Sequence, residues 1–290
     1  MTPWFDPQNK RDYFCIIWNL LRKCNCNCLG CTYHDNTPVK LIDVDKVINF
    51  IKNNFDFTKS YKQITLFGGE PTLHPEFKKI IDELYKLNVY LILYTNLTAD
   101  IDTYKYCQDR KVHLTITYHH NAFKNVMDFV NKLMYLDASD ISLIYVKHKG
   151  YENNYKLLKN MFGEDKTTLI AIHRTSQFVD TPVLNINKTC DGKIDGKKAN
   201  WADIVETDKN HFTGWKCVAG KNSFYIEQNG DVFACEGIGQ EYYRKCLYNK
   251  LGNIEDTKFK FTPKETICPC RWCGFEAFLT KENIDKNIKD

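Results

Sequence analysis

The chain alternates between short apolar stretches rich in branched and aromatic residues and longer stretches with apolar residues at helical spacing. The short stretches predict buried β-strands, and the longer ones predict amphipathic helices. Strands that alternate with helices pair in parallel, and the helices then cover the sheet from outside. The expected strands span residues 13–20, 63–67, 89–94, 112–118, 141–147 and 167–173, and the expected helices span 44–55, Pro75 to Leu87, 100–109, 122–136 and 152–162.

Six strand–helix units are too few to close an eight-stranded barrel. We therefore expect an α/β fold with a partial (β/α)6 TIM-like barrel over residues 1–180, which holds its site at the C-terminal ends of the strands. Residues 181–213 are polar, contain several glycines and lack periodicity, so they predict a linker. Residues 214–290 predict a small cysteine-rich domain that contains a β-hairpin around Asn229-Gly230.

Composition limits the classes of protein to consider. The chain has 13 cysteines, an odd number that is partly grouped in closely spaced sets, and its first residues do not resemble a secretory signal. Metal or cluster ligation in a reducing cytoplasm is therefore favoured over a disulfide framework. No apolar run reaches membrane-spanning length, so we expect no membrane partner. The formal charge of +4 gives no support to a nucleic-acid partner.

Three cysteines with the spacing C-x3-C-x2-C follow the first expected strand, namely Cys24, Cys28 and Cys31. A four-iron cluster is usually held by four cysteines, so a loop that offers three thiolates leaves one iron open to another ligand. Cys26 lies within the same loop and is either a bystander thiol, which we favour, or an alternative ligand.

This spacing resembles that of the radical S-adenosylmethionine (radical SAM) superfamily. Gly68-Gly69-Glu70-Pro71, after the second expected strand, resembles the family's GGEP segment, which binds the amino group of the methionine part of S-adenosylmethionine. The same resemblance makes Asn96 and Thr117 candidate cofactor-binding residues. A tight turn would also explain Gly68–Pro71, and β-propensity would explain Thr117. The chain departs from the family at Gly30, where an aromatic residue is usual.

The C-terminal cysteines resemble the SPASM/twitch extension of radical SAM enzymes. Cys217-x12-Gly230-x4-Cys235 matches its opening, and a later group contains Cys268, Cys270 and Cys273. The resemblance implies one auxiliary [4Fe-4S] cluster held by Cys217, Cys235, Cys270 and Cys273, with Cys268 as a possible replacement. A structural zinc site with four cysteine ligands is the competing interpretation.

The resemblance implies an enzyme that cleaves S-adenosylmethionine reductively at a [4Fe-4S] cluster. The resulting 5′-deoxyadenosyl radical would abstract a hydrogen from a small molecule or a peptide, with the auxiliary cluster in electron transfer. An external one-electron donor of the flavodoxin or ferredoxin type is implied as a partner. The alternatives are a nucleotide-modifying radical SAM enzyme and a non-enzymatic zinc protein.

No catalytic side chain is selected by the sequence. Polar residues near the strand ends are candidates for lining the substrate cavity, but each is better explained as a surface or core-edge residue: Tyr94, His119, His120, Lys147, His173 and Arg174.

Overall fold

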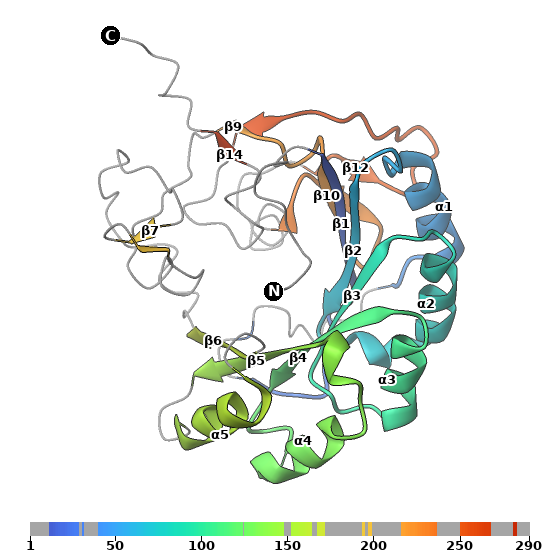
Figure 1. Ribbon diagram of the computed structural model, residues 1–290. Coiled ribbons are helices and arrows are strands. Elements are labelled where there is room, and N and C mark those ends of the chain that lie inside the picture. Colours follow the sequence, from blue (N-terminus) through green and yellow to red (C-terminus); the bar gives the residue numbers. More distant parts are fainter. Residues whose placement is uncertain are drawn as a thin grey trace.

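The main element of the fold is a nine-stranded sheet with the order β12-β11-β10-β1-β2-β3-β4-β5-β6 (Figure 1). The computed structural model describes residues 12–28, 31, 40–123, 125–147, 152–163, 167–171, 193–194, 197–198, 216–236, 250–267 and 281–282. Six strands run parallel in chain order: β1 (Tyr13–Leu21), β2 (Tyr61–Gly68), β3 (Tyr90–Thr95), β4 (Val112–Tyr118), β5 (Ile141–Lys147) and β6 (Thr167–Ala171).

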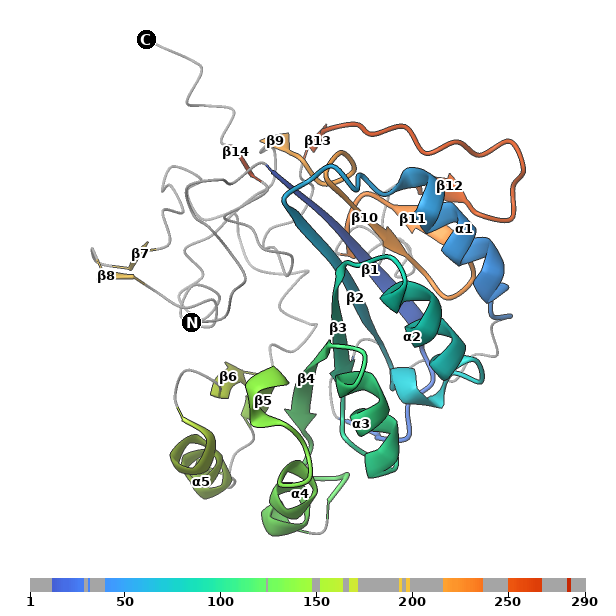
Figure 2. The same ribbon diagram turned by 45° about the vertical axis from the view of Figure 1, so that its right-hand side comes forward.

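Five helices connect these strands: α1 (Val44–Asn54), α2 (Phe77–Tyr85), α3 (Ile101–Gln108), α4 (Val126–Leu133) and α5 (Glu152–Phe162). They lie along one side of the curved sheet (Figures 1 and 2). A short 3-10 turn, η2 (Ala138–Asp140), precedes β5. Helices on the outside of an open parallel sheet confirm the predicted partial barrel.

The two faces of the sheet differ in polarity because successive side chains of a strand point to opposite faces. The face toward the helices is apolar and belongs to the main core, for example through Ile64 and Leu66 of β2 and Leu114 of β4. The alternate positions include polar side chains such as Gln63 and Thr115. The barrel therefore buries a polar inner face, where a site for polar ligands can form.

The segments that flank α1 and α2 confirm one expectation and change another. The Asp43 side chain caps α1 by accepting a hydrogen bond from the Asp45 amide at 2.8 Å, as the sequence predicts. Pro75, which we expected in the first turn of a helix, precedes α2 instead. The chain first makes one 3-10 turn, η1 (Pro71–Leu73), because the Glu70 side chain accepts a hydrogen bond from the Thr72 amide.

The C-terminal part extends the barrel sheet beyond β1. Strand β10 (Ser223–Ile226) pairs with β1 in parallel, and β11 (Asp231–Phe233) and β12 (Gly252–Asn253) follow in antiparallel pairing. The predicted hairpin is thus confirmed, with Gly230 at a φ of 84° in its turn. All nine residues of β1 are buried, and β10 covers the edge that β2 leaves open. The predicted domain boundary therefore does not coincide with an edge of the sheet.

Smaller sheets complete the part of the chain that the structure describes. Strand β9 (Lys216–Cys217) lies between β13 (Thr266–Ile267) and β14 (Lys281–Glu282), and β7 (Lys193–Ile194) pairs with β8 (Lys197–Lys198). Within the described residues, the helices are all too short or too polar to cross a bilayer.

Candidate functional site

The cysteine loop begins three residues after the C-terminal end of β1. The Cys24 and Cys28 side chains are half-buried, Cys26 is buried and Cys31 is exposed. The Cys26 amide donates a hydrogen bond to the Cys24 sulfur at 3.3 Å, and the Cys31 amide donates to the Cys28 carbonyl at 3.2 Å. These local contacts bend the loop, so that Cys26 lies close to both Cys24 and Cys28.

The thiols of the loop differ in acidity because Cys26 donates hydrogen bonds to its neighbours. Its thiol lowers the pKa of Cys24 to about 7. It also lowers the pKa of Cys28 to about 4, with a smaller contribution from His119. The pKa of Cys26 itself is raised, because its proton is held by these two sulfurs. Cys24 and Cys28 therefore have the thiolate character that metal ligands need.

The Gly68–Pro71 segment packs against the backbone that leads into the cysteine loop. The Gly69 amide donates to the Leu21 carbonyl at 2.8 Å, and the Glu70 amide donates to the Lys23 carbonyl at 3.0 Å. A Cβ atom on Gly69 would lie 2.2 Å from the Lys23 carbonyl oxygen. Gly68 has a φ of 139°, and a Cβ atom there would lie 2.3 Å from the Leu21 carbonyl oxygen. Both glycines are therefore required for the contact between the two loops.

The Glu70 carboxylate is fully buried and joins this segment to the end of β3. One oxygen accepts hydrogen bonds from the Thr72 amide at 3.2 Å, the Thr72 hydroxyl at 2.6 Å and the Thr95 hydroxyl at 2.8 Å. The other accepts from the Asn96 amide at 2.8 Å. Burial raises the pKa of Glu70 above its usual value. The carboxylate therefore holds the Gly68–Pro71 segment against the end of β3.

Asn96 connects the end of β3 to the cysteine loop. Its side-chain nitrogen donates to the Cys26 sulfur at 3.2 Å and to the Asn25 oxygen at 2.9 Å. Its side-chain oxygen accepts from the Thr98 amide at 3.0 Å and from the Thr98 hydroxyl at 2.6 Å. The polar atoms of this predicted cofactor-binding residue are thus occupied by protein groups that shape the loop.

His119 and Asn121, which follow β4, contact the same loop from the next strand. The Nδ1 atom of His119 lies 3.1 Å from the Cys28 sulfur. The Cys28 thiol also lies 3.7 Å from the Asn121 side-chain oxygen. The sequence predicts that His119 lies at a strand end but favours a surface or core-edge role for it, whereas the structure brings it to Cys28. Asn121 is not predicted from the sequence, although its position shortly after a barrel strand is a signal that could have found it.

The other predicted residues lie around this centre or outside the described part. Thr117 is half-buried on β4, on the same face as His113 and Thr115. The His113 ring lies 2.9 Å from the Ser142 hydroxyl, and Tyr94 remains 40% exposed. The side chain of Lys147 and all atoms of Gly30, His173 and Arg174 lie outside the described residues.

The second cysteine group is described only in part. Cys217 is buried on β9, where the Ala219 amide donates to its sulfur at 3.5 Å, and Cys235 is half-buried two residues after β11. Cys268, Cys270 and Cys273 lie outside the described residues. Within the described ranges, no three Cys, His, Asp or Glu side chains gather as they would around a single metal ion. The ligands of an iron–sulfur cluster bind different irons, so they need not converge on one point.

A partial barrel with a cysteine loop, a glycine turn and polar side chains at the C-terminal ends of β1 to β4 has the arrangement in which α/β barrel enzymes hold their sites. Residues 18–155 match the family described as the Radical SAM superfamily, so this part of the chain is a domain of that family. No curated protein matches the chain.

Solved structures share the fold. The chain is similar to native anSMEcpe with bound AdoMet and Kp18Cys peptide, with 17% identity over 84% of this chain and 78% of that chain and a TM-score of 0.55. The same protein with the Cp18Cys peptide gives 17% identity over the same shares and a TM-score of 0.54. Streptococcus suis SuiB has 12% identity, covers 85% of this chain and 64% of its own, and has a TM-score of 0.41.

A Radical SAM domain makes the chain an enzyme and implies a [4Fe-4S] cluster and S-adenosylmethionine. The cysteine loop has a donor set that suits such a cluster. It offers thiols, two of them with a lowered pKa, at the C-terminal edge of a barrel. The alternative of a non-enzymatic zinc protein is therefore set aside.

Proposed function

We propose that Cys24, Cys28 and Cys31 hold the [4Fe-4S] cluster and leave one iron without a protein ligand. The observation that carries this proposal is the meeting of the cysteine loop with the Gly68–Pro71 segment, Asn96 and His119 at one edge of the sheet. Four successive strands each contribute to this meeting point, as expected for a barrel site. Cys26 serves as a hydrogen-bond donor to its neighbours rather than as a ligand.

S-adenosylmethionine would bind beside this loop, along the Gly68–Pro71 segment and the inner face of β4. The two glycines keep the segment narrow enough to lie against the chain before Cys24. Asn96 shapes the loop through its bond to Cys26, and Thr117 lies further along the rim. When bound, the cluster would supply an electron that cleaves the sulfonium to methionine and a 5′-deoxyadenosyl radical, which abstracts a hydrogen from the substrate.

The substrate that we propose to test first is a peptide. The fold shared with anSMEcpe, which was solved with a bound peptide, supports this choice over a small molecule. Cys217, Cys235, Cys270 and Cys273 would hold an auxiliary [4Fe-4S] cluster in a SPASM/twitch-type domain. Four thiolates saturate a cluster, which favours electron transfer over substrate binding there. An external flavodoxin- or ferredoxin-type protein would supply the electron.

We also propose that the enzyme is cytoplasmic, because closely grouped cysteines without a secretory signal are typical of metal or cluster ligation in a reducing compartment.

The test is the cleavage of S-adenosylmethionine by the anaerobically purified protein under dithionite. We expect 5′-deoxyadenosine and methionine from the wild type and none from Cys28→Ala. That variant should keep the iron and sulfide of the auxiliary site. Unchanged cleavage by Cys28→Ala would overturn the assignment. Deuterium transfer from labelled peptides into 5′-deoxyadenosine would then identify the substrate.

A further inference from the structure

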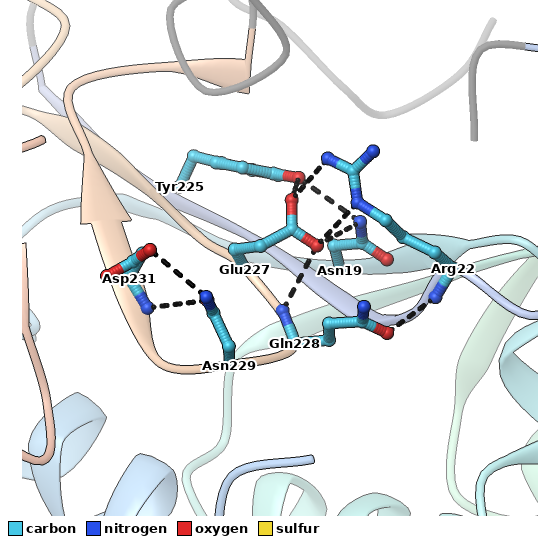
Figure 3. A network of polar contacts seen from close by, with 7 residues as sticks. All are labelled: Asn19, Arg22, Tyr225, Glu227, Gln228, Asn229 and Asp231. Atoms are coloured by element: carbon cyan, nitrogen blue, oxygen red, sulfur yellow. Dashed lines mark hydrogen bonds and ion pairs between the residues drawn. The ribbon is translucent and has the colours of Figure 1, made fainter. Parts of the chain in front are cut away.

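A buried ion pair joins the chain just before the cysteine loop to the C-terminal hairpin (Figure 3). The Nη2 atom of Arg22 lies 2.9 Å from one Glu227 oxygen, and its Nε atom lies 3.2 Å from the other. The two side chains are only 11% and 1% exposed, although 205 residues separate them in the sequence. This is the two-pronged geometry in which arginine binds a carboxylate most specifically.

Three further hydrogen bonds hold the same pair in place (Figure 3). The Asn19 side-chain nitrogen donates to Glu227 at 2.7 Å, and the Tyr225 hydroxyl donates to it at 2.5 Å. The Arg22 backbone amide donates to the Gln228 side-chain oxygen at 2.8 Å. The hairpin therefore fixes both the backbone and the side chain of Arg22.

The opposite side of this segment is held by the glycine turn. The Leu21 and Lys23 carbonyls accept the hydrogen bonds from Gly69 and Glu70 described above. Asn19, which is fully buried, directs its side-chain oxygen toward Gly68 and its nitrogen toward Glu227. Residues 19–23 are thus held by hydrogen bonds from the C-terminal hairpin on one side and from the glycine turn on the other. They lie immediately before Cys24, the first predicted cluster ligand.

We propose that Glu227 is a positioning residue for the N-terminal cluster, acting through Arg22 on Cys24. This inference rests on the proposed function, because it takes Cys24, Cys28 and Cys31 as the cluster ligands. A buried ion pair adds little net stability compared with apolar packing, but it is directional. The ion pair fixes the orientation of Arg22, so that its backbone amide faces Gln228. It thereby also fixes the direction in which the chain enters the cysteine loop. The C-terminal hairpin would then support the first cluster in addition to carrying Cys235.

The test compares Glu227→Gln with Asp231→Asn in the full-length protein. Asp231 is a matched control in the same hairpin (Figure 3). It is 4% exposed, and it accepts hydrogen bonds from Lys250 at 2.8 Å and from Asn253 at 2.8 Å. Both substitutions remove one buried carboxylate. The Glu227 carboxylate is bonded to Asn19 and Arg22 before the cysteine loop, whereas the Asp231 carboxylate is bonded to Lys250 and Asn253.

Two measurements follow on each variant. The first is amide hydrogen exchange over residues 19–28. The second is the loss, in the presence of an iron chelator, of the reduced-cluster EPR signal that responds to S-adenosylmethionine. We expect Glu227→Gln to increase amide hydrogen exchange over residues 19–28 and to lose the EPR signal about tenfold faster in the chelator. A loss of this size is typical when a residue that supports the direct ligands of a metal is replaced. We expect Asp231→Asn to match the wild type in both, including the shape of the EPR signal.

The outcomes separate this inference from the proposed function. If Glu227→Gln and Asp231→Asn behave alike in both measurements, Glu227 is only a structural residue and the inference is overturned. If the wild type gives no EPR signal that responds to S-adenosylmethionine, the proposed function fails. Amide hydrogen exchange over residues 19–28 still tests whether Glu227 holds Arg22 in place. Should Glu227→Gln not fold, Gln228→Ala removes the side chain that accepts the hydrogen bond from the Arg22 amide. Faster exchange at Arg22 in that variant supports the inference, and unchanged exchange contradicts it.

Discussion

The Nδ1 atom of His119 lies 3.1 Å from the sulfur of Cys28, although 91 residues separate the two in the sequence. The imidazole donates to the sulfur in the tautomer that carries its proton on Nδ1. Hydrogen bonds to the sulfurs are one of the features that set the reduction potential of an iron–sulfur cluster. His119 therefore lies where it can adjust the reduction potential of the cluster that we propose for this loop.

Replacing His119 by alanine should make the reduction potential of the N-terminal cluster more negative. The hydrogen bond to the Cys28 sulfur stabilises the more negative, reduced state, so its loss disfavours reduction. An EPR-monitored redox titration measures the midpoint directly. His120→Ala, at the neighbouring position, is the control and should leave the midpoint unchanged. Equal midpoints for His119→Ala and the wild type would contradict the role of His119.

The cysteines of the loop should react with iodoacetamide in a fixed order in the metal-free protein. Only the thiolate is the nucleophile, so a cysteine reacts at pH values above its pKa. Cys28, with a pKa of about 4, should be modified already at mildly acidic pH, and Cys24, with a pKa of about 7, only near neutrality. Cys26 should resist modification because its pKa is raised. Mass spectrometry of peptides across a pH series measures this order, and simultaneous modification of all three would contradict it.

Glu70→Gln should destabilise the fold by about 1–3 kcal/mol, because it replaces an acceptor oxygen with an amide group that faces hydrogen-bond donors. Urea unfolding measures the difference in the free energy of unfolding. Glu76→Gln alters an exposed carboxylate six residues away and should change that free energy by less than about 0.5 kcal/mol. An equal decrease in the free energy of unfolding in the two variants would show that the hydrogen bonds of Glu70 do not stabilise the fold.

The pH dependence of stability should report on the same carboxylate. Because burial raises the pKa of Glu70 in the folded chain, the folded state binds its proton more tightly than the unfolded state. The contribution of Glu70 to the free energy of unfolding should therefore decrease as the pH rises above the usual value of 4.5. Glu70→Gln should lack this component in a series of urea titrations. An identical pH profile for both proteins would rule the contribution out.

Gly69→Ala should disturb the cysteine loop, because the added Cβ would lie 2.2 Å from the Lys23 carbonyl oxygen. Overpacking of this kind costs about 1–3 kcal/mol. Gly252→Ala is a matched control, since its Cβ would lie 2.1 Å from the Phe259 ring, away from the cysteine loop. Both variants should be less stable than the wild type. Only Gly69→Ala should change the iodoacetamide reactivity of Cys24 and Cys28, and an unaltered pattern would show that the glycine turn does not hold the loop.

The parts of this account that the sequence could predict depend on local patterns. The periodicity of Val44, Val47, Ile48 and Ile51 indicated α1, and Asp43 indicated its cap. The alternation of strands and helices predicted the parallel sheet, and the spacing of Cys24, Cys28 and Cys31 indicated the loop that we propose for the cluster. Each of these signals is contained in a short stretch of chain, so no knowledge of the packing is needed.

The remaining features depend on pairs of residues that are distant in the sequence. Nothing in the apolar stretch of β1 indicates that β10 covers its second edge, and nothing around Glu227 indicates Arg22 as its partner. Likewise, the bonds of Glu70 to Thr95 and of Asn96 to Cys26 form only once β1, β2 and β3 are aligned. A sequence pattern can predict that a residue follows a strand, but its partner is fixed by the register of the sheet.

The most direct test of the account is the EPR spectrum of the dithionite-reduced protein before and after S-adenosylmethionine is added. An iron without a protein ligand in the cluster of Cys24, Cys28 and Cys31 predicts a four-iron signal that changes shape when the sulfonium compound binds. A signal that does not respond, or a protein that contains zinc instead of iron at these cysteines, would contradict the account.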